Sequence, residues 1–292
     1  MQLTLHARQP FSLHSVIYSH GWCQLAPFKE DASQAGLSLI TRLENSQVVE
    51  LHLSETPGGV LIETPETLDD QAIRNISEMI NWMLGLDQEF SDFYALAGAE
   101  PKLAKAAARA QGRILRSPTL FEDVIKTILT TNTLWAATKR MNANLVAQFG
   151  DSLPTNLEAR AFPTPASLAA ADEATLRAQT RLGYRAPSVL ALAQRVASGE
   201  LDLESLKHSD LPSTELRKRL QTIRGIGPYA SANLLMLLGR YNFLTVDSWA
   251  IKMVSQEWYN GGPVTPAQVE SAFEKWGDWR GLAYWLWDWT RV

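Results

Sequence analysis

The chain has 292 residues, of which 46% are hydrophobic and 20% charged, a composition typical of folded globular proteins and unlike that of disordered or fibrous ones. The length allows one large domain or two closely packed ones, at roughly 100 to 200 residues per domain. The single cysteine, Cys23, excludes an internal disulfide, a multi-cysteine zinc site and an iron–sulfur cluster, and no apolar run approaches the roughly 20 residues of a membrane-spanning helix. We therefore expect a cytoplasmic protein.

The net charge of −4 is unevenly distributed along the chain. Residues 1–100 hold four Lys/Arg and fourteen Asp/Glu, whereas residues 101–292 hold the remaining 23 basic and 17 acidic side chains. An acidic first part joined to a basic second part indicates that any polyanion would bind the second part.

Residues 1–66 have the pattern of an antiparallel sheet domain. Apolar and polar residues alternate from Leu3 to Ala7, and a second apolar alternation follows at 48–53. The Thr-Pro-Gly-Gly sequence at 56–59 separates that segment from another apolar run at 60–62, which predicts a hairpin.

Residues 67–292 have the pattern of helices separated by Gly and Pro, so the predicted fold class is α+β, with a sheet domain followed by an all-helical body. An apolar stripe predicts a helix over 118–130, and Pro187 opens another apolar helical segment. A third helix is predicted over 227–238, and Asp247 opens a fourth.

A helix-hairpin-helix is predicted at about 216–238. One helix ends near Leu220, a tight turn holds Gly225 and Gly227, and Pro228 suits the first position of the next helix. Glycines let the backbone approach a ligand, and helix N-terminal amides bind anions such as a DNA phosphate. The two glycines alone are equally compatible with an ordinary helix–turn–helix corner.

The segment IRGIGPYASANLLMLLGR, followed by VDSWAIK, resembles the helix-hairpin-helix DNA glycosylase superfamily. The N-terminal sheet domain narrows the resemblance to the branch of 3-methyladenine glycosylase II and 8-oxoguanine glycosylase. The resemblance implies that Asp247 is the catalytic carboxylate. As an alternative, Asp247 only caps the helix that starts at Ser248.

Two further segments extend this resemblance. In RLGYRA, the family pattern implies that Tyr184 wedges beside the flipped nucleotide and that Arg185 lies near the opposite strand. The alternative is a buried tyrosine with a surface arginine. The segment FEDVIKTILTTNT resembles the helix whose end fills the gap left by the extruded base, which makes Asn132 the candidate for that role. Asn132 is equally compatible with simply terminating the helix.

The hairpin also departs from the family pattern. Tyr229 stands where bifunctional members carry a Schiff-base lysine, so we predict a monofunctional glycosylase that hydrolyses the bond with water. The alternatives are a bifunctional glycosylase/lyase for oxidised purines, should Lys218 or Lys252 reach the sugar, and a non-catalytic DNA-binding protein. Arg224 replaces the commoner proline before the hairpin glycine.

The resemblance further implies a Na⁺ or K⁺ ion held by main-chain carbonyls, which by register are those of Gln221, Ile223 and Gly225. No other cofactor is expected.

Ten tryptophans are many for this length, and eight of them follow residue 130. Aromatic walls stack on bases and favour cationic ones, such as alkylated purines. The candidates for the base pocket are Tyr229, Trp249 and Trp285, with core packing as the alternative. The positions at which 8-oxoguanine-reading members place a glutamine and an aromatic residue hold Tyr284 and Asp288 here, so we expect alkylated purines rather than 8-oxoguanine.

Together these features predict a DNA repair enzyme of the nucleoid, a monomer whose partner is double-stranded DNA with a damaged base. The five histidines show no metal-ligand spacing and are predicted to be structural. The pair Glu122-Asp123 lies in the first turn of a predicted helix, where acidic groups favour the helix dipole.

Overall fold

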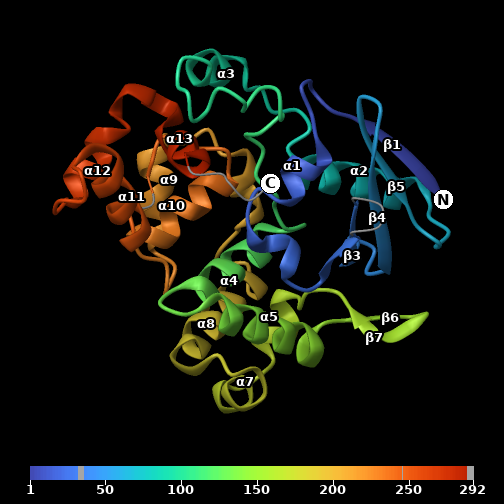
Figure 1. Cartoon of the computed structure of the whole chain (residues 1–292). Helices are drawn as coiled ribbons and strands as arrows, with labels where there is room; N and C mark the ends of the chain where they lie inside the picture. Colours follow the sequence, from blue (N-terminus) through green and yellow to red (C-terminus); the bar gives the residue numbers. More distant parts are fainter. Residues whose placement is uncertain (32–35, 245, 288–292) are drawn as a thin grey trace. The chain divides into compact units, whose positions relative to one another are not determined.

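The computed structural model describes residues 1–31, 36–244 and 246–287 (Figure 1). Its chain divides into two compact units. The sheet unit joins residues 1–89 to residues 109–207, and the hairpin unit joins residues 90–108 to the chain from His208 onward. The change of pattern near residue 66 marks the end of the sheet, but the units do not divide there, because the helices that follow the sheet belong to the same unit.

Five antiparallel strands form the sheet, in the spatial order β1-β5-β4-β3-β2 (Figure 1). The sequence predicted three of them and missed the two at one side. Gly59 opens β5 where the backbone is close-packed, since a Cβ there would lie 1.9 Å from the carbonyl oxygen of Leu5. The strands are β1 (Gln2–His6), β2 (Phe28–Asp31), β3 (Gly36–Arg42), β4 (Val48–Thr56) and β5 (Gly59–Glu63).

A core forms between this sheet and α2 (Asp70–Leu84). Leu51 and Ile62 on the strands and Ile76 and Ile80 on the helix are all fully buried. At the edge of this layer, the hydroxyl of Thr41 donates to the sulfur of Met79 at 3.6 Å.

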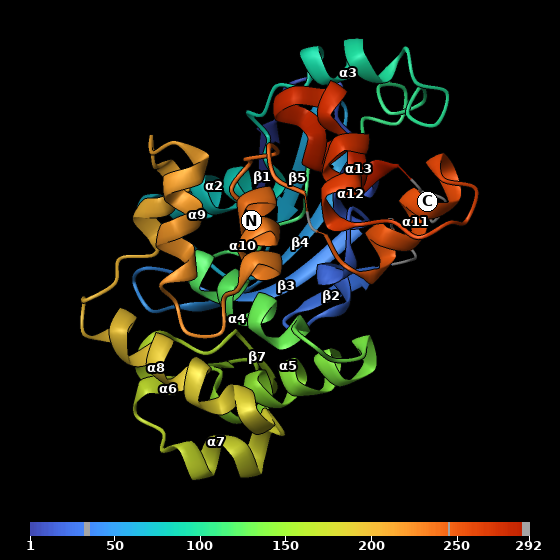
Figure 2. The same ribbon diagram turned by 90° about the vertical axis from the view of Figure 1, so that its left-hand side faces the viewer.

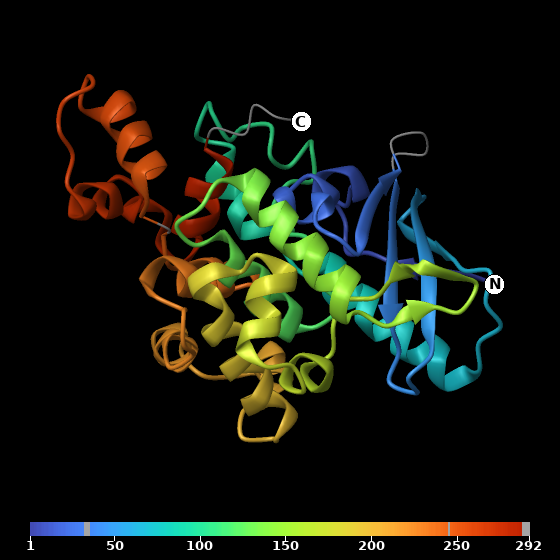
Figure 3. The ribbon, with the colours of Figure 1, turned by 90° about the horizontal axis from the view of Figure 1, so that it is seen from below.

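A short hairpin that the sequence did not predict interrupts the helices of the sheet unit. Its strands are β6 (Ser152–Leu153) and β7 (Asn156–Arg160), drawn in yellow-green beside the blue strands in Figure 3. Leu153 and Ala161 pack there against Ile40 and Val48 of the sheet. The remaining helices of this unit are α1 (Leu13–Ile17), η1 (Gly21–Gln24), α4 (Leu120–Thr130), α5 (Trp135–Phe149), α6 (Pro165–Ala169), α7 (Glu173–Thr180), η2 (Gly183–Arg185), α8 (Ala186–Ala197) and η3 (Glu204–His208), which crosses into the hairpin unit.

Helix α4 is the predicted apolar helix, and Thr119 caps it by accepting a hydrogen bond from the Glu122 N–H at 3.2 Å. The apolar stripe predicts one buried face, but the polar residues of this helix are buried as well. Lys126 pairs with Glu122 at 2.6 Å and also donates to Ser117 Oγ at 3.2 Å. Glu122 and Asp123 do lie in the first turn, as predicted, but they belong to a buried network rather than to a solvated helix end.

Helices are the only regular elements among the described residues of the hairpin unit, which has an aromatic core. Phe93 and Phe273 are fully buried, and Tyr241 stacks on Trp279 with ring centroids 5.5 Å apart. Trp276 and Trp287 belong to this core, whereas Trp249 and Trp258 are exposed. The helices are α3 (Ser91–Ala97), α9 (Ser213–Gln221), α10 (Pro228–Leu237), α11 (Ser248–Trp258), α12 (Pro266–Ala272), η4 (Glu274–Trp279) and α13 (Arg280–Leu286).

Candidate active site

The predicted helix-hairpin-helix is present. Helices α9 and α10 run side by side in Figure 2, joined by a turn that ends at Gly227. Gly225 has a φ of +92°, a backbone conformation that L side chains rarely adopt. The side chain of Gln221 donates to Ser231 Oγ at 3.0 Å, which ties the end of the first helix to the start of the second.

The second glycine of the hairpin and the two residues after it are open to solvent. A Cβ at Gly227 would meet no atom within 4 Å, so the backbone there faces open space. Pro228 occupies the first position of α10, and Gly227, Pro228 and Tyr229 are all exposed. An approaching anion could therefore reach the N-terminus of α10 without a steric barrier from these residues.

The three carbonyls predicted to hold a monovalent cation lie around this turn. That of Ile223 accepts a hydrogen bond from the Ile226 N–H at 3.0 Å, which leaves its second lone pair for a ligand. Carbonyl oxygens suit hard cations, so Gln221, Ile223 and Gly225 have the right chemistry for Na⁺ or K⁺. In the described part of the chain, no cluster of three or more His, Cys, Asp or Glu could hold a metal ion.

Asp247 is the N-cap of α11, so the predicted capping role is confirmed. Its Oδ1 accepts a hydrogen bond from the Ala250 N–H at 2.8 Å. The same oxygen accepts a second hydrogen bond, from the hydroxyl of Tyr284 at 3.4 Å. The side chain is only half-buried, so capping the helix does not close the carboxylate to a ligand.

Two phenols lie near this carboxylate, and both titrate above the ordinary range. Burial raises the pKa of Tyr229. A hydrogen bond with Asn233 lowers it in part, and the negative charge of Asp247 adds a smaller rise. Burial likewise raises the pKa of Tyr284, followed by the charge of Asp247. Both phenols therefore remain protonated at neutral pH.

The aromatic pocket candidates differ in exposure. Trp249 is 52% exposed, in the first turn of α11 and two residues from Asp247. Tyr229 is partly exposed, and Trp285 is half-buried on α13. Tyr284, the other predicted base-reading position, turns its hydroxyl to Asp247, and Asp288 lies outside the described residues.

The remaining three candidates meet in the sheet unit. The hydroxyl of Tyr184 donates to the Thr131 carbonyl at 3.3 Å, and the guanidinium of Arg185 donates to the carbonyls of Thr131 and Asn132. Arg185 also stacks over the Tyr184 ring, 4.4 Å from its centroid. The alternative of a buried tyrosine with a surface arginine is wrong on both counts, because Tyr184 is 59% exposed and Arg185 only 7%.

Asn132 follows the end of α4 with a φ of +48°, a conformation in which asparagine is tolerated better than most residues. Two positions further on, Leu134 is 80% exposed, an unusual environment for a large apolar side chain. Sequence reasoning missed Leu134. The available signal was its position beside Asn132, between the end of one helix and the start of another.

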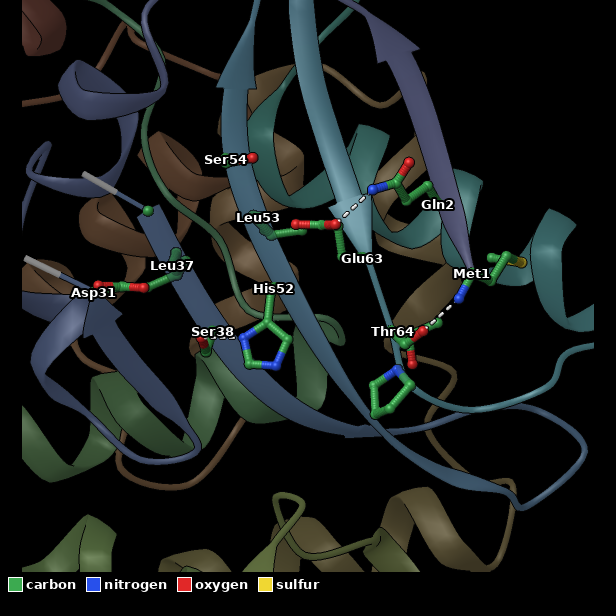
Figure 4. Close-up of a pocket in the computed structure, with 12 residues that line it drawn as sticks. Met1, Gln2, Asp31, Leu37, Ser38, His52, Leu53, Ser54, Glu63 and Thr64 are labelled. Carbon is green, nitrogen blue, oxygen red and sulfur yellow. Dashed lines mark hydrogen bonds between the residues drawn. The ribbon is translucent and has the colours of Figure 1, made fainter. Parts of the chain in front are cut away.

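A separate hollow of about 610 Å³ lies over the sheet and is lined by residues of all five strands (Figure 4). It contains none of the predicted site residues. Its lining includes His52, whose ring shares a 2.8 Å hydrogen bond with Ser38, and Glu63, which accepts one from Gln2 at 2.7 Å.

Comparison of the sequence with known proteins finds one family. A family model described as "HhH-GPD superfamily base excision DNA repair protein" matches residues 125–278. A Bacillus subtilis (strain 168) protein named DNA-3-methyladenine glycosylase is 29% identical over 168 residues, which cover 57% of this chain and 55% of that protein. Escherichia coli (strain K12) DNA-3-methyladenine glycosylase 2 is 30% identical over 181 residues, covering 61% and 60%. The chain thus matches less than two thirds of the length of either relative.

Solved structures share the fold along nearly the whole chain. The 3-methyladenine DNA glycosylase of Archaeoglobus fulgidus superposes with a TM-score of 0.78 at 21% identity, covering 100% of this chain and 99% of that one. The Clostridium acetobutylicum 8-oxoguanine glycosylase/lyase, bound to double-stranded DNA, gives 0.74 at 21% identity, with coverages of 100% and 97%. None of the described helices is long and apolar enough to cross a membrane.

Proposed function

The chain belongs to the HhH-GPD superfamily of base excision DNA repair proteins, and on that premise we propose that it is a DNA glycosylase that hydrolyses the N-glycosidic bond of a damaged base. The observation that carries the proposal is the half-buried carboxylate of Asp247, which caps α11 shortly after the hairpin. For DNA binding alone such a carboxylate would be unfavourable, because a negative charge facing a polyanion weakens the complex.

The chemistry follows from the charge that develops in the reaction. Breaking the bond between base and sugar leaves positive charge on the sugar, which a fixed carboxylate stabilises more in the transition state than in the ground state. Asp247 also orients the attacking water and accepts its proton as the water adds to the sugar. The target nucleotide must leave the stack to reach such a group, at a cost of a few kcal/mol that damage to the base partly relieves.

We assign the enzyme to the monofunctional class. A lyase needs an amine nucleophile, and Tyr229 stands at the position where the family pattern would place a lysine. Its raised pKa keeps the phenol protonated and therefore a poor nucleophile. Lys218, one of the two other lysines considered, is strongly exposed and pairs with Glu215 at 2.8 Å.

The substrate we propose is an alkylated purine. Trp249 and Tyr229 offer exposed aromatic faces within the same unit as Asp247, and Trp285 is half-buried on α13. Aromatic faces attract cations, and alkylation at ring nitrogens gives a purine positive charge. The names of the two curated relatives, both 3-methyladenine glycosylases, agree with this choice.

Double-stranded DNA is the proposed partner, bound by two parts of the chain. The N-terminus of α10 at Gly225 and Gly227 would take a backbone phosphate, with Na⁺ or K⁺ on the carbonyls of Gln221, Ile223 and Gly225 adding positive charge beside it. In the sheet unit, Asn132, Leu134 and Tyr184 would fill the space that the flipped nucleotide leaves, and Arg185 would hold their loop. We propose that the protein acts as a monomer associated with the nucleoid.

The direct test is incubation with DNA duplexes that each carry one lesion, followed by alkaline cleavage of abasic sites. Release of 3- or 7-methylpurines is the expected result. Duplex binding without any base release would favour the non-catalytic alternative, and strand cleavage without alkali would favour the bifunctional one.

A further inference from the structure

The carboxylate of Asp247 is held at one oxygen by groups from two helices. The Ala250 N–H of α11 donates to Oδ1 at 2.8 Å, and the Tyr284 hydroxyl of α13 donates to the same atom at 3.4 Å. The first hydrogen bond is ordinary helix capping. The second reaches across 37 positions of the chain and has no role in forming α11.

Helix α13 is locked in place, which fixes the position of the phenol. Gly281, in its first turn, donates its N–H to the Tyr241 carbonyl at 2.7 Å. A Cβ at this glycine would lie 2.4 Å from the Phe243 carbonyl oxygen, so the helix rests directly on that backbone. The Tyr284 ring packs edge-on against Phe273 with centroids 5.7 Å apart, and the side chain is buried. The hydroxyl therefore cannot follow the carboxylate through large movements.

We infer that Tyr284 is a positioning residue for Asp247. With Oδ1 bound on one side by the helix cap and on the other by the phenol, rotation of the carboxylate is restricted and Oδ2 is left to face sugar and water. This inference rests on the proposed function, because it assigns Tyr284 a role only through a catalytic Asp247. It also explains why an aromatic residue with a hydroxyl, rather than a base-reading amide, occupies this position on α13.

The hydrogen bond from Tyr284 has a second effect on the Asp247 carboxylate, which acts on the rate in the opposite direction to positioning. A hydrogen bond draws negative charge from the carboxylate, and by that effect alone its loss would strengthen stabilisation of the cationic sugar. Orientation outweighs this effect in our account, because a small misplacement of a catalytic group is costly. Tyr284→Phe should therefore slow base release rather than accelerate it.

The experiment compares single-turnover base release and duplex affinity for wild type, Tyr284→Phe, Asp247→Asn and the double variant. We expect Tyr284→Phe to reduce the rate by about 10- to 100-fold, as for loss of a hydrogen bond to a charged group, while the Kd for a lesion duplex stays within about twofold. In the Asp247→Asn background the same change should have no further effect. Tyr259→Phe, at the far end of α11, removes a phenol without touching Asp247 and is the matched control.

Three results would overturn the inference: an unchanged or faster rate in Tyr284→Phe, equal losses in both backgrounds, or a loss confined to Kd. A fall in thermal unfolding midpoint that tracks the rate loss would likewise assign Tyr284 a purely structural role. Failure of the proposed function is a different outcome, in which Asp247→Asn itself keeps its activity.

Discussion

Trp22 and Asp123 meet in the core of the sheet unit, where the indole N–H donates to Oδ1 of the carboxylate at 2.8 Å. The Ser117 N–H donates to the same oxygen at 3.0 Å. Burial nevertheless raises the pKa of Asp123 to about 6. Beside them His20, whose ring lies 4.6 Å from that of Trp22, has its pKa lowered by burial to about 4. Burial therefore shifts both groups toward their neutral forms relative to the unfolded chain, so His20 is neutral at pH 7 and Asp123 is neutral below a pH of about 6.

These shifts give stability two pH dependences of opposite sign. Between its unfolded pKa of about 4 and its folded pKa of about 6, Asp123 binds a proton only in the folded chain, so stability falls as the pH rises through this window. His20 binds a proton only in the unfolded chain between pH of about 4 and 6.5, so stability falls as the pH drops through that window.

Asp123→Asn should separate the two dependences. Relative to wild type, the free energy of unfolding of the variant should increase by about 3 kcal/mol from pH 4 to pH 7, in addition to a constant change from altered contacts. Urea denaturation at a series of pH values measures this difference, and His20→Asn should show the reverse slope. A difference independent of pH would show that the Asp123 carboxyl is not neutralised by burial.

Leu134 and Leu157 form a natural pair for testing the proposed DNA contact in the sheet unit. Both are exposed, at 80% and 69%, but Leu157 lies on β7 and has no proposed role. Leu134→Ala should reduce single-turnover base release about tenfold, because an apolar wedge helps to offset the cost of unstacking. Fluorescence of 2-aminopurine placed next to the lesion should report less flipping. Equal effects of the two substitutions would remove Leu134 from the DNA-binding surface.

The monofunctional assignment predicts the form of the product. With Tyr229 at the place of the amine, the wild-type protein should leave an intact abasic site, and borohydride should trap no covalent adduct with DNA. Gel analysis before and after alkali makes the distinction. A trapped adduct would move the protein to the bifunctional class, and Lys252→Ala and Lys218→Ala would then identify the amine.

Trp249 should affect cationic substrates most. Stacking on an electron-rich face favours cationic bases, so Trp249→Ala should slow the release of 7-methylpurine more than that of neutral hypoxanthine. The two rate losses should differ by about fivefold. Trp249→Phe, which keeps a π face, should retain most of the preference. If 8-oxoguanine opposite cytosine proves the best wild-type substrate, the alkylpurine proposal fails.

The sequence predicts the helices next to Asp247 and the hairpin from their neighbouring residues alone. Pro228 marks the start of α10 and Asp247 the cap of α11, because capping and proline geometry depend only on neighbouring residues. Strand β2 was missed since it includes the polar run from Lys29 to Asp31, and its pairing with β3 decides its conformation. The contact between Tyr284 and Asp247 depends on the packing of α13, which no local pattern encodes.

Long-range contacts also explain the division into units and the burial of Arg185. Residues 90–108 join the hairpin unit through contacts such as that between Glu100 and Lys275 at 3.0 Å, far apart in the sequence. The placement of Arg185 near DNA stays a prediction, and the structure adds that its guanidinium donates to the carbonyl of Thr131, 54 positions earlier. A sequence pattern gives the residue type at such a position and not the partner that buries it.

Asp247→Asn is the substitution that separates the chemistry from DNA binding. Asparagine keeps the shape and an oxygen for the helix cap but removes the negative charge. In a single-turnover assay on a methylpurine duplex, base release should fall by about 100-fold or more, with the Kd for the duplex unchanged within about twofold. Near-normal release by a folded Asp247→Asn variant would show that another group performs the chemistry.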